Sequence, residues 1–164
     1  MNREYLQSQG FEGFETMGEI MDGLRTLIPA QKDIYVVLRE SGSIPHFLSK
    51  ETGGFFKRKN PNVSIVELKA NWVEGSYVVY IGKACGAGSS ASFRKRLDQY
   101  LHFGQGTSVG HWVGCYIWQL ADSRDLVICW KNLPFDDPRT VERQTLADFK
   151  AVHAGTRPFA NLIY

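Results

Sequence analysis

A tyrosine, a lysine and an arginine lie close together in YVVYIGKACGAGSSASFRKRL, which spans residues 77–97. The β-branched and aromatic run 77–81 is typical of a buried strand. A loop of Gly, Ala and Ser follows, and the next segment has the pattern of a helix with three consecutive basic residues. A strand that ends near Tyr80 and Lys83, followed by a helix that carries Arg96, suits an anion. Many different anions would fit this arrangement.

Tyr35 lies in a second apolar run, DIYVVLRE (33–40), which is also predicted to be a strand. If the two strands pair, Tyr35 and Tyr80 come together with Arg96 one loop away. Each residue alone has an ordinary alternative role. A strand tyrosine commonly packs with its hydroxyl in water, and an arginine in FRKRL commonly lies on a solvated helix face. Only the combination favours a chemical role.

Glu142 lies in a predicted helix at a position where an apolar residue is expected. The helix has a strong start signal at Asp137-Pro138 and a stop signal at Gly155. Leu146 follows Glu142 by one turn, so the two share the inward-facing stripe. A carboxylate on that stripe is costly unless it is paired or binds a metal. Such a departure from the pattern is typical of functional sites.

The composition bounds the class of protein. With 164 residues the chain is long enough for one ordinary domain, and 43% hydrophobic and 22% charged residues are globular values. A net charge of +2 neither requires nor excludes a nucleic-acid partner. The sequence has no signal peptide and no run of membrane-spanning length, and its three cysteines lack metal-ligand spacing. A reduced, cytoplasmic protein is therefore expected.

The chain is predicted to consist of an N-terminal extension and one domain. Residues 1–32 are expected to form a helical extension packed on the domain, because the apolar residues of 14–28 recur at helical spacing. The domain is expected to span residues 33–164. Within it, residues 41–75 contain several glycines and prolines. We interpret them as an insertion between the first two strands, with a short helix or strand at 63–72.

Two more strands and one more helix are predicted in the domain. WVGCYIWQL (112–120) has the composition of a strand, and LVICW (126–130) is expected to be its hairpin partner across the turn ADSRD. SFRKRLDQYLHF (92–103) is predicted to be a helix that buries Phe93 and Leu97 on one face.

The glycine-rich loop also suggests a nucleotide site. Residues 86–91 match the loose G-x-G-x-x-A pattern of dinucleotide-binding folds, but no acidic residue follows at the position that would bind ribose. A phosphate-binding P-loop requires a lysine after the glycines, whereas Lys83 precedes them. The histidines lack zinc-ligand spacing with the cysteines, so a structural zinc site is not expected. Dinucleotide binding is the weakest of the functions considered.

The strongest signal is a resemblance to the GIY-YIG nuclease family. IYVV (34–37) and VYIGKA (79–84) resemble the two halves of the family signature. Three further segments follow in the family's order: RKRLDQY (94–100), the glutamate-bearing ERQTLADFK (142–150) and RPFAN (157–161). The resemblance covers residues 33–164 and is more specific than a single YIG motif.

The resemblance implies an α+β fold in which a small central antiparallel β-sheet is flanked by α-helices. It also implies an endonuclease that cuts nucleic acid, expected to be DNA, with one divalent metal ion, Mg²⁺ or Mn²⁺. The implied site comprises four catalytic residues, Tyr35, Tyr80, Arg96 and Glu142, and three substrate-binding residues, Lys83, Tyr100 and Asn161. Glu142 would be the metal ligand, Tyr35 the general base and Tyr80 its helper.

These residue types suit the hydrolysis of a phosphodiester. Glu142 can hold one hard cation, which neutralises charge on the phosphate and on the departing oxygen. Arg96 can offer its planar guanidinium to the non-bridging oxygens. A phenol has an ordinary pKa of about 10, so a tyrosine base requires a lower pKa, which Lys83, Arg96 and the metal are expected to supply.

Two departures from the family pattern concern Asp33, where the family prefers Gly, and the segment 41–75, which is unusually long. In that segment the basic residues 57–59 follow two phenylalanines. They are either a nucleic-acid contact or a solvated loop over buried rings. A non-catalytic nucleic-acid-binding module on the same fold is the alternative function.

Overall fold

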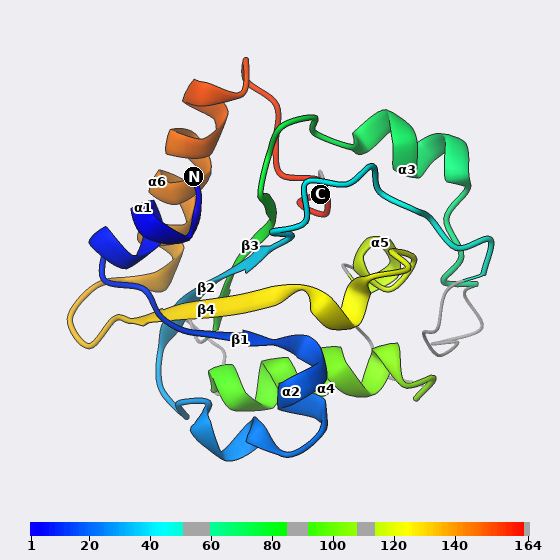
Figure 1. The fold of residues 1–164 in the computed structure, drawn as a ribbon. Coiled ribbons are helices and arrows are strands. Elements are labelled where there is room, and N and C mark those ends of the chain that lie inside the picture. Colours follow the sequence, from blue (N-terminus) through cyan, green and yellow to red (C-terminus); the bar gives the residue numbers. More distant parts are fainter. Residues whose placement is uncertain (51–59, 85–91, 108–113, 163–164) are drawn as a thin grey trace.

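The computed structural model describes residues 1–50, 60–84, 92–107 and 114–162. A four-stranded antiparallel sheet lies at its centre, with the strand order β1-β4-β2-β3 (Figure 1). The strands are β1 (Glu12–Thr16), β2 (Asp33–Leu38), β3 (Val78–Ala84) and β4 (Val127–Asn132). The predicted α+β class with a small antiparallel sheet is confirmed.

Helices cover both faces of the sheet. In Figure 1, α1 and α6 lie on one side and α4 on the other. The α-helices are α1 (Arg3–Ser8), α2 (Met17–Met21), α3 (Ile65–Asn71), α4 (Phe93–Gly104), α5 (Gly114–Ile117) and α6 (Pro138–Val152). Two 3₁₀ turns, η1 (Leu24–Leu27) and η2 (Ser123–Asp125), join other elements.

The central strand β2 is buried along its whole length because both of its faces are covered. Tyr35 and Val37 belong to the core on the α4 side, with Phe93 of α4. Ile34 and Val36 belong to the core on the other side, together with residues of α1 and α6. This alternation follows from the two-residue period of a strand. It places Tyr35 on the α4 face of the sheet.

The two helices that were predicted from periodicity and end signals are confirmed. Pro138 is the first residue of α6, and the Asp137 side chain caps the helix by accepting a hydrogen bond from the Thr140 amide at 3.0 Å. Ser92 caps α4 through the Lys95 amide. The paired strands β2 and β3 are confirmed as well, with Tyr35 opposite Gly82.

The helix predicted at 14–28 is wrong. The chain there forms the end of β1, then α2, then η1. Thr16 starts α2 with a capping box, in which its hydroxyl accepts from the Glu19 amide and the Glu19 carboxylate accepts from the Thr16 amide. Phe14 has a positive φ of 62° at a bulge in the β1–β4 pairing. The apolar residues therefore serve separate short elements, and the extension contributes a strand to the sheet.

The strand predicted at 112–120 is also wrong in its described part, because Gly114–Ile117 is the helix α5. All four of its residues are buried. A short apolar run that is buried on every side gives no periodicity that separates a strand from a helix. The predicted strand at 126–130 is β4, but it pairs with β1 and β2 instead of forming a hairpin with the preceding segment.

The segment 41–75 contains a helix, α3, as one of the two predicted options. Gln119 is fully buried, and its side-chain amide anchors this segment. Its amide oxygen accepts from the Val63 amide at 2.6 Å, and its amide nitrogen donates to the carbonyls of Leu48 and Val63. In the described ranges, no helix combines the length and the apolar character needed to cross a membrane.

Candidate active site

Tyr35 and Tyr80 lie side by side over Gly82. Their ring centroids are 5.7 Å apart, and the Tyr35 ring also packs 5.0 Å from Phe93. A Cβ at position 82 would come within 2.6 Å of the Tyr80 Cε1 atom and 2.8 Å of the Tyr35 hydroxyl oxygen. Any side chain there would displace the rings. Gly82 is therefore required to leave room for the tyrosine pair.

Burial raises the pKa of both tyrosines. For Tyr35 the positive charge of Arg96 and the hydrogen bond with the Tyr80 side chain oppose this effect, but the pKa still lies above its ordinary value. The pKa of Tyr80 is raised further, by burial and then by Tyr35. Of the cations that were expected to lower these pKa values, Arg96 does so, but desolvation outweighs its effect. Tyr35 is the more acidic phenol of the pair.

The helix α4 contributes one exposed and one buried residue. Arg96 is exposed, and its charge lowers the pKa of both tyrosines, so it lies near the pair. Tyr100 is only 4% exposed and packs against Trp118, whose indole N–H donates to the Tyr100 carbonyl at 3.2 Å. Burial raises the pKa of Tyr100, with a smaller effect of Tyr35 and Tyr80. Tyr100 thus supports the pair from the core.

Glu142 forms an ion pair with Lys83. The Lys83 ammonium donates to the Oε2 atom of Glu142, and the two side chains are 32% and 17% exposed. The pair accounts for the carboxylate on the apolar stripe of α6. Lys83 lies three residues after Tyr80 and so points to the opposite face of β3. Glu142 nevertheless raises the pKa of both tyrosines, so the site extends around the edge of the sheet.

Asn161 binds the outer edge of β3. Its amide oxygen accepts from the Ile81 amide at 2.9 Å, and its amide nitrogen donates to the Ile81 carbonyl at 2.7 Å. Next to it, the Ala160 amide donates to the Val79 carbonyl at 2.8 Å. The Asn161 side chain therefore binds the strand and positions it, and its assignment as a substrate-binding residue stays a prediction.

Glu142 could hold a metal ion as a single carboxylate. Among the described residues no group of three or more His, Cys, Asp or Glu side chains could do so. The Oε2 atom of Glu142 accepts from Lys83, whereas no hydrogen bond of Oε1 is found in the described ranges. One carboxylate fits Mg²⁺, which keeps several waters and is usually completed by substrate phosphates. The described residues do not provide a pair of metal ions with ligands.

Asp33 is a buried acid that the sequence analysis noted only as a departure from a family motif. It lies on the same face of β2 as Tyr35 and is fully buried, and neither carboxylate oxygen has a hydrogen-bond partner among the described residues. Burial raises its pKa to about 7, with a further contribution from the negative charge of Glu12. A signal existed in the sequence, namely an aspartate at the start of the apolar run DIYVVL.

Some sequence predictions lie outside the described residues. These are the basic residues 57–59 with their neighbouring phenylalanines and the glycine-rich loop at 86–91. The residues that the structure does bring together are Tyr35, Tyr80, Lys83, Arg96 and Glu142.

Comparison of the chain with family models, with curated proteins and with solved structures finds no match in any of the three.

Proposed function

We propose that the protein is a divalent-metal-dependent endonuclease of the GIY-YIG type, with DNA as its substrate. The observation that carries this proposal is the convergence of two tyrosines, an arginine and a lysine–glutamate pair at one edge of the sheet. These residues come from four separate elements, β2, β3, α4 and α6. The resemblance of the sequence to that family supports the same assignment.

In the proposed reaction Tyr35 takes the proton of a water molecule whose oxygen attacks phosphorus. The bond from the water oxygen to phosphorus forms, the bond from phosphorus to the leaving sugar oxygen breaks, and that oxygen later takes a proton from solvent. Tyr35 loses its own proton more readily than Tyr80, so it is the tyrosine that can accept a proton from water. The hydrogen bond between them lowers the pKa of Tyr35 and raises that of Tyr80, so Tyr80 donates to the Tyr35 oxygen.

Arg96 and Lys83 provide the positive charge around the phosphate. Arg96 is exposed and lies near the tyrosine pair, so its guanidinium can bind two non-bridging oxygens. Lys83 is held by Glu142. Glu142 would hold Mg²⁺ or Mn²⁺, which would supply positive charge to the phosphate, and Lys83 could then contact a phosphate oxygen.

A cleavage assay tests the proposal. The wild-type protein is incubated with plasmid, linear, branched and single-stranded DNA, and with RNA, in Mg²⁺ or in EDTA. We expect cleavage of at least one DNA in Mg²⁺ only, and loss of cleavage in Glu142→Gln. Asp148→Asn is the matched control, because Asp148 is an exposed carboxylate of the same helix that binds only Gln144 in the described residues.

The outcomes separate the candidate functions. Cleavage that persists in EDTA, or a Glu142→Gln variant that cuts as fast as the wild type, would contradict the metal site. Tight binding of DNA without cleavage of any substrate would favour the non-catalytic binding module. Preferential cleavage of RNA would keep the chemistry and correct the substrate.

A further inference from the structure

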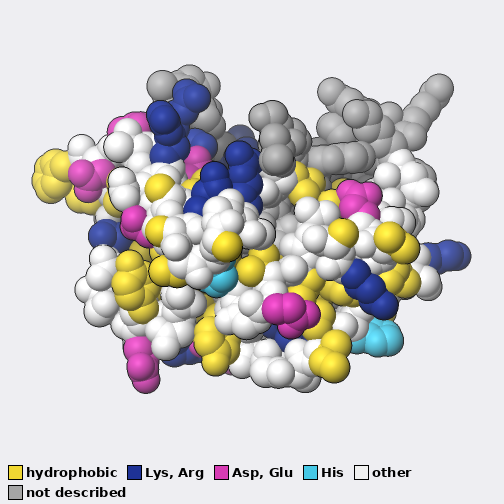
Figure 2. Space-filling view, turned by 90° about the horizontal axis from the view of Figure 1, so that it is seen from above, with side chains coloured by type: hydrophobic (Ala, Val, Ile, Leu, Met, Phe, Trp, Pro, Cys, Tyr) yellow, Lys and Arg dark blue, Asp and Glu magenta, His cyan; other side chains and the backbone are white. Residues whose placement is uncertain are grey.

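A hollow of about 730 Å³ lies between α3 and the chain that follows α6. Both walls contain polar or charged residues beside apolar ones; the polar and charged residues include Glu67, Asn71, Lys150, Thr156, Arg157 and Asn161. We call this hollow the C-terminal groove. Figure 2 looks down on the end of the molecule where α6 and the C-terminal segment lie, and lysine and arginine side chains gather on that face toward the α6 side.

The positive charges of the C-terminal groove are not neutralised within the described part of the chain. Lys150 is half-buried and Arg157 is exposed, and neither forms an ion pair with a described acidic residue. Arg157 makes only a long hydrogen bond of 3.5 Å to the Leu162 carbonyl. The acidic residue of the groove, Glu67, accepts a hydrogen bond of 2.5 Å from the Tyr116 hydroxyl. Two cations thus line the groove without an acidic partner among the described residues.

The C-terminal groove lies along the same two elements, β3 and α6, that carry Lys83 and Glu142 of the candidate active site. Asn161 lines the groove and also binds Ile81, two residues or about 7 Å along β3 from Lys83. On the other side, Lys150 follows Glu142 by eight residues of α6, which is about 12 Å of helix. Each strand of B-DNA advances about 3.4 Å per phosphate. The groove therefore begins within reach of the next few phosphates beyond the site.

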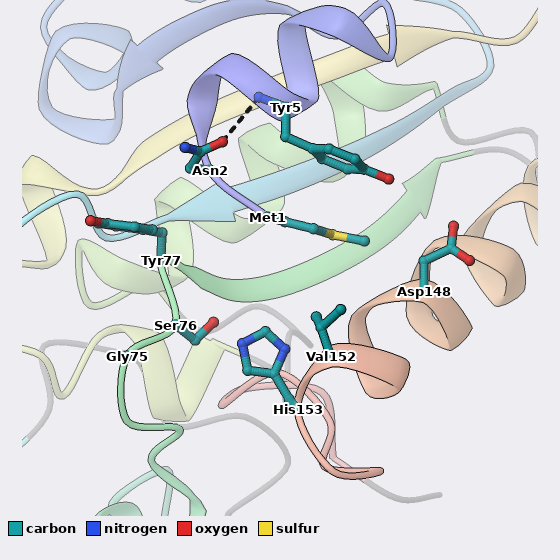
Figure 3. A pocket seen from close by; sticks show the side chains of 9 residues that line it. All are labelled: Met1, Asn2, Tyr5, Gly75, Ser76, Tyr77, Asp148, Val152 and His153. Carbon is teal, nitrogen blue, oxygen red and sulfur yellow. Dashed lines mark hydrogen bonds between the residues drawn. The ribbon is translucent and has the colours of Figure 1, made fainter.

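A second hollow, of about 430 Å³, has the opposite character. It lies between the N-terminal residues, the turn before β3 and the end of α6 (Figure 3). Tyr5, Tyr77, Asp148 and His153 line it, and no lysine or arginine does. None of the candidate site residues lines this hollow. It therefore differs from the C-terminal groove, which has Lys150 and Arg157 in its walls.

We infer that the C-terminal groove holds the sugar-phosphate backbone of the strand that is cut, with Lys150 and Arg157 on successive phosphates. This inference rests on the proposed function, because the proposed cleavage site at Lys83 and Glu142 defines where the DNA strand enters the groove. The two cations bind phosphates and carry no sequence information, so they contribute affinity and register but no chemistry. They are substrate-positioning residues.

A salt titration of binding tests this inference. Affinity of the full chain for a short fluorescent DNA, as single strand and as duplex, is measured in Ca²⁺ without Mg²⁺ at several salt concentrations. Each lost phosphate contact lowers the slope of log K against log salt by about 0.9 in duplex DNA and about 0.7 in a single strand. We expect Lys150→Gln/Arg157→Gln to lower the slope by about 1.8 or 1.4.

A charge-matched control isolates the groove. Lys69→Gln/Arg124→Gln removes two exposed positive charges that do not line the groove, and it should leave the slope near the wild-type value. An equal slope in the groove variant and the control would overturn the inference. Thermal unfolding of both variants checks that the fold is retained.

Failure of the inference can be distinguished from failure of the proposed function. If the wild type cuts DNA and the groove variant binds with an unchanged slope, the groove inference is wrong and the nuclease assignment stands. If the slope falls as expected but no substrate is cut, the groove inference stands and the catalytic assignment is wrong.

Discussion

Tyr35 and Tyr80 differ in pKa because one donates to the other inside a buried pair. Tyr35→Phe removes the proposed base while the ring that packs on Phe93 remains. We expect the cleavage rate to fall by a factor of about 10² to 10⁴ with DNA binding retained.

The dependence of this rate on pH gives the more specific prediction. Burial raises the pKa of Tyr35, so the wild-type rate should still be rising at about pH 10, the ordinary phenol value. Tyr35→Phe should lack this rise. Tyr80→Phe removes the hydrogen bond that lowers the pKa of Tyr35, so it should move the rise to higher pH. A Tyr35→Phe variant that keeps the rise would show that another group is the base.

Asp33 makes the free energy of unfolding depend on pH, and the sign of this dependence follows from the burial of its carboxylate. Its folded-state pKa of about 7 lies above the ordinary value of 3.8, so the folded state holds a proton that the unfolded state loses. The free energy of unfolding should therefore fall as pH rises from about 4 to about 7, and this contribution should be lost above that range. Asp33→Asn cannot ionise and should be more stable than the wild type at pH 8.

Chemical denaturation at a series of pH values measures this effect. Asp136→Asn is a suitable control, because that carboxylate is exposed. Equal pH dependence in Asp33→Asn and the wild type would mean that Asp33 is ionised without cost in the folded protein.

At the scale of the elements, β3 depends on one side chain at its outer edge. Asn161→Ala leaves the Ile81 amide and carbonyl without their partner, and an unsatisfied buried polar group costs about 1–3 kcal/mol. We expect a loss of stability in that range and faster hydrogen exchange of the Ile81 amide. Cleavage should weaken too, because the same strand carries Tyr80 and Lys83.

Asn71→Ala is the control for this prediction. Its side-chain amide donates only to the Glu67 carbonyl on the exposed side of α3, so the substitution should cost little. Equal exchange at Ile81 in the wild type and in Asn161→Ala would contradict the bracing role.

Elements with a clear period and end signals were predictable from the sequence, and those without them were not. The strand with Tyr35 is rich in β-branched residues, and α6 has a proline after its capping aspartate. In contrast, α5 is buried on all sides, so tertiary packing and not a local pattern decides its conformation. The capping box at Thr16 divides a stretch whose apolar spacing resembles one helix.

At the scale of the whole molecule, the N-terminal extension is part of the domain core. Leu6 of α1 is fully buried in the same cluster as Phe149 of α6 and Cys129 of β4. Leu6→Ala should therefore lower the free energy of unfolding by about 2–5 kcal/mol. Val66→Ala is the control, because Val66 is 79% exposed and should tolerate truncation. Similar thermal unfolding of the two variants would contradict a structural role for the extension.

The sequence predicted which residues belong to the candidate site but not how they are arranged in space. The resemblance named Tyr35 and Glu142, which are far apart in the chain, and the structure brings them to one edge of the sheet. Local patterns do not encode which helix covers each face of β3, nor that Asp33 lacks a partner among the described residues or that Lys150 lines a groove. These facts depend on the packing of distant segments.

The contact between Asn161 and Ile81 has a consequence for solubility. The side-chain amide of Asn161 offers the same kinds of donor and acceptor as a peptide group. Unlike a strand, however, it cannot extend the pairing to further residues. Asn161 and Ala160 thus occupy positions on the edge of the sheet where a strand of a second molecule could add. A chain that lost this segment would expose a pairing edge next to the apolar residues of β3. At high protein concentration, pairing between the exposed strand edges of different molecules would then compete with folding.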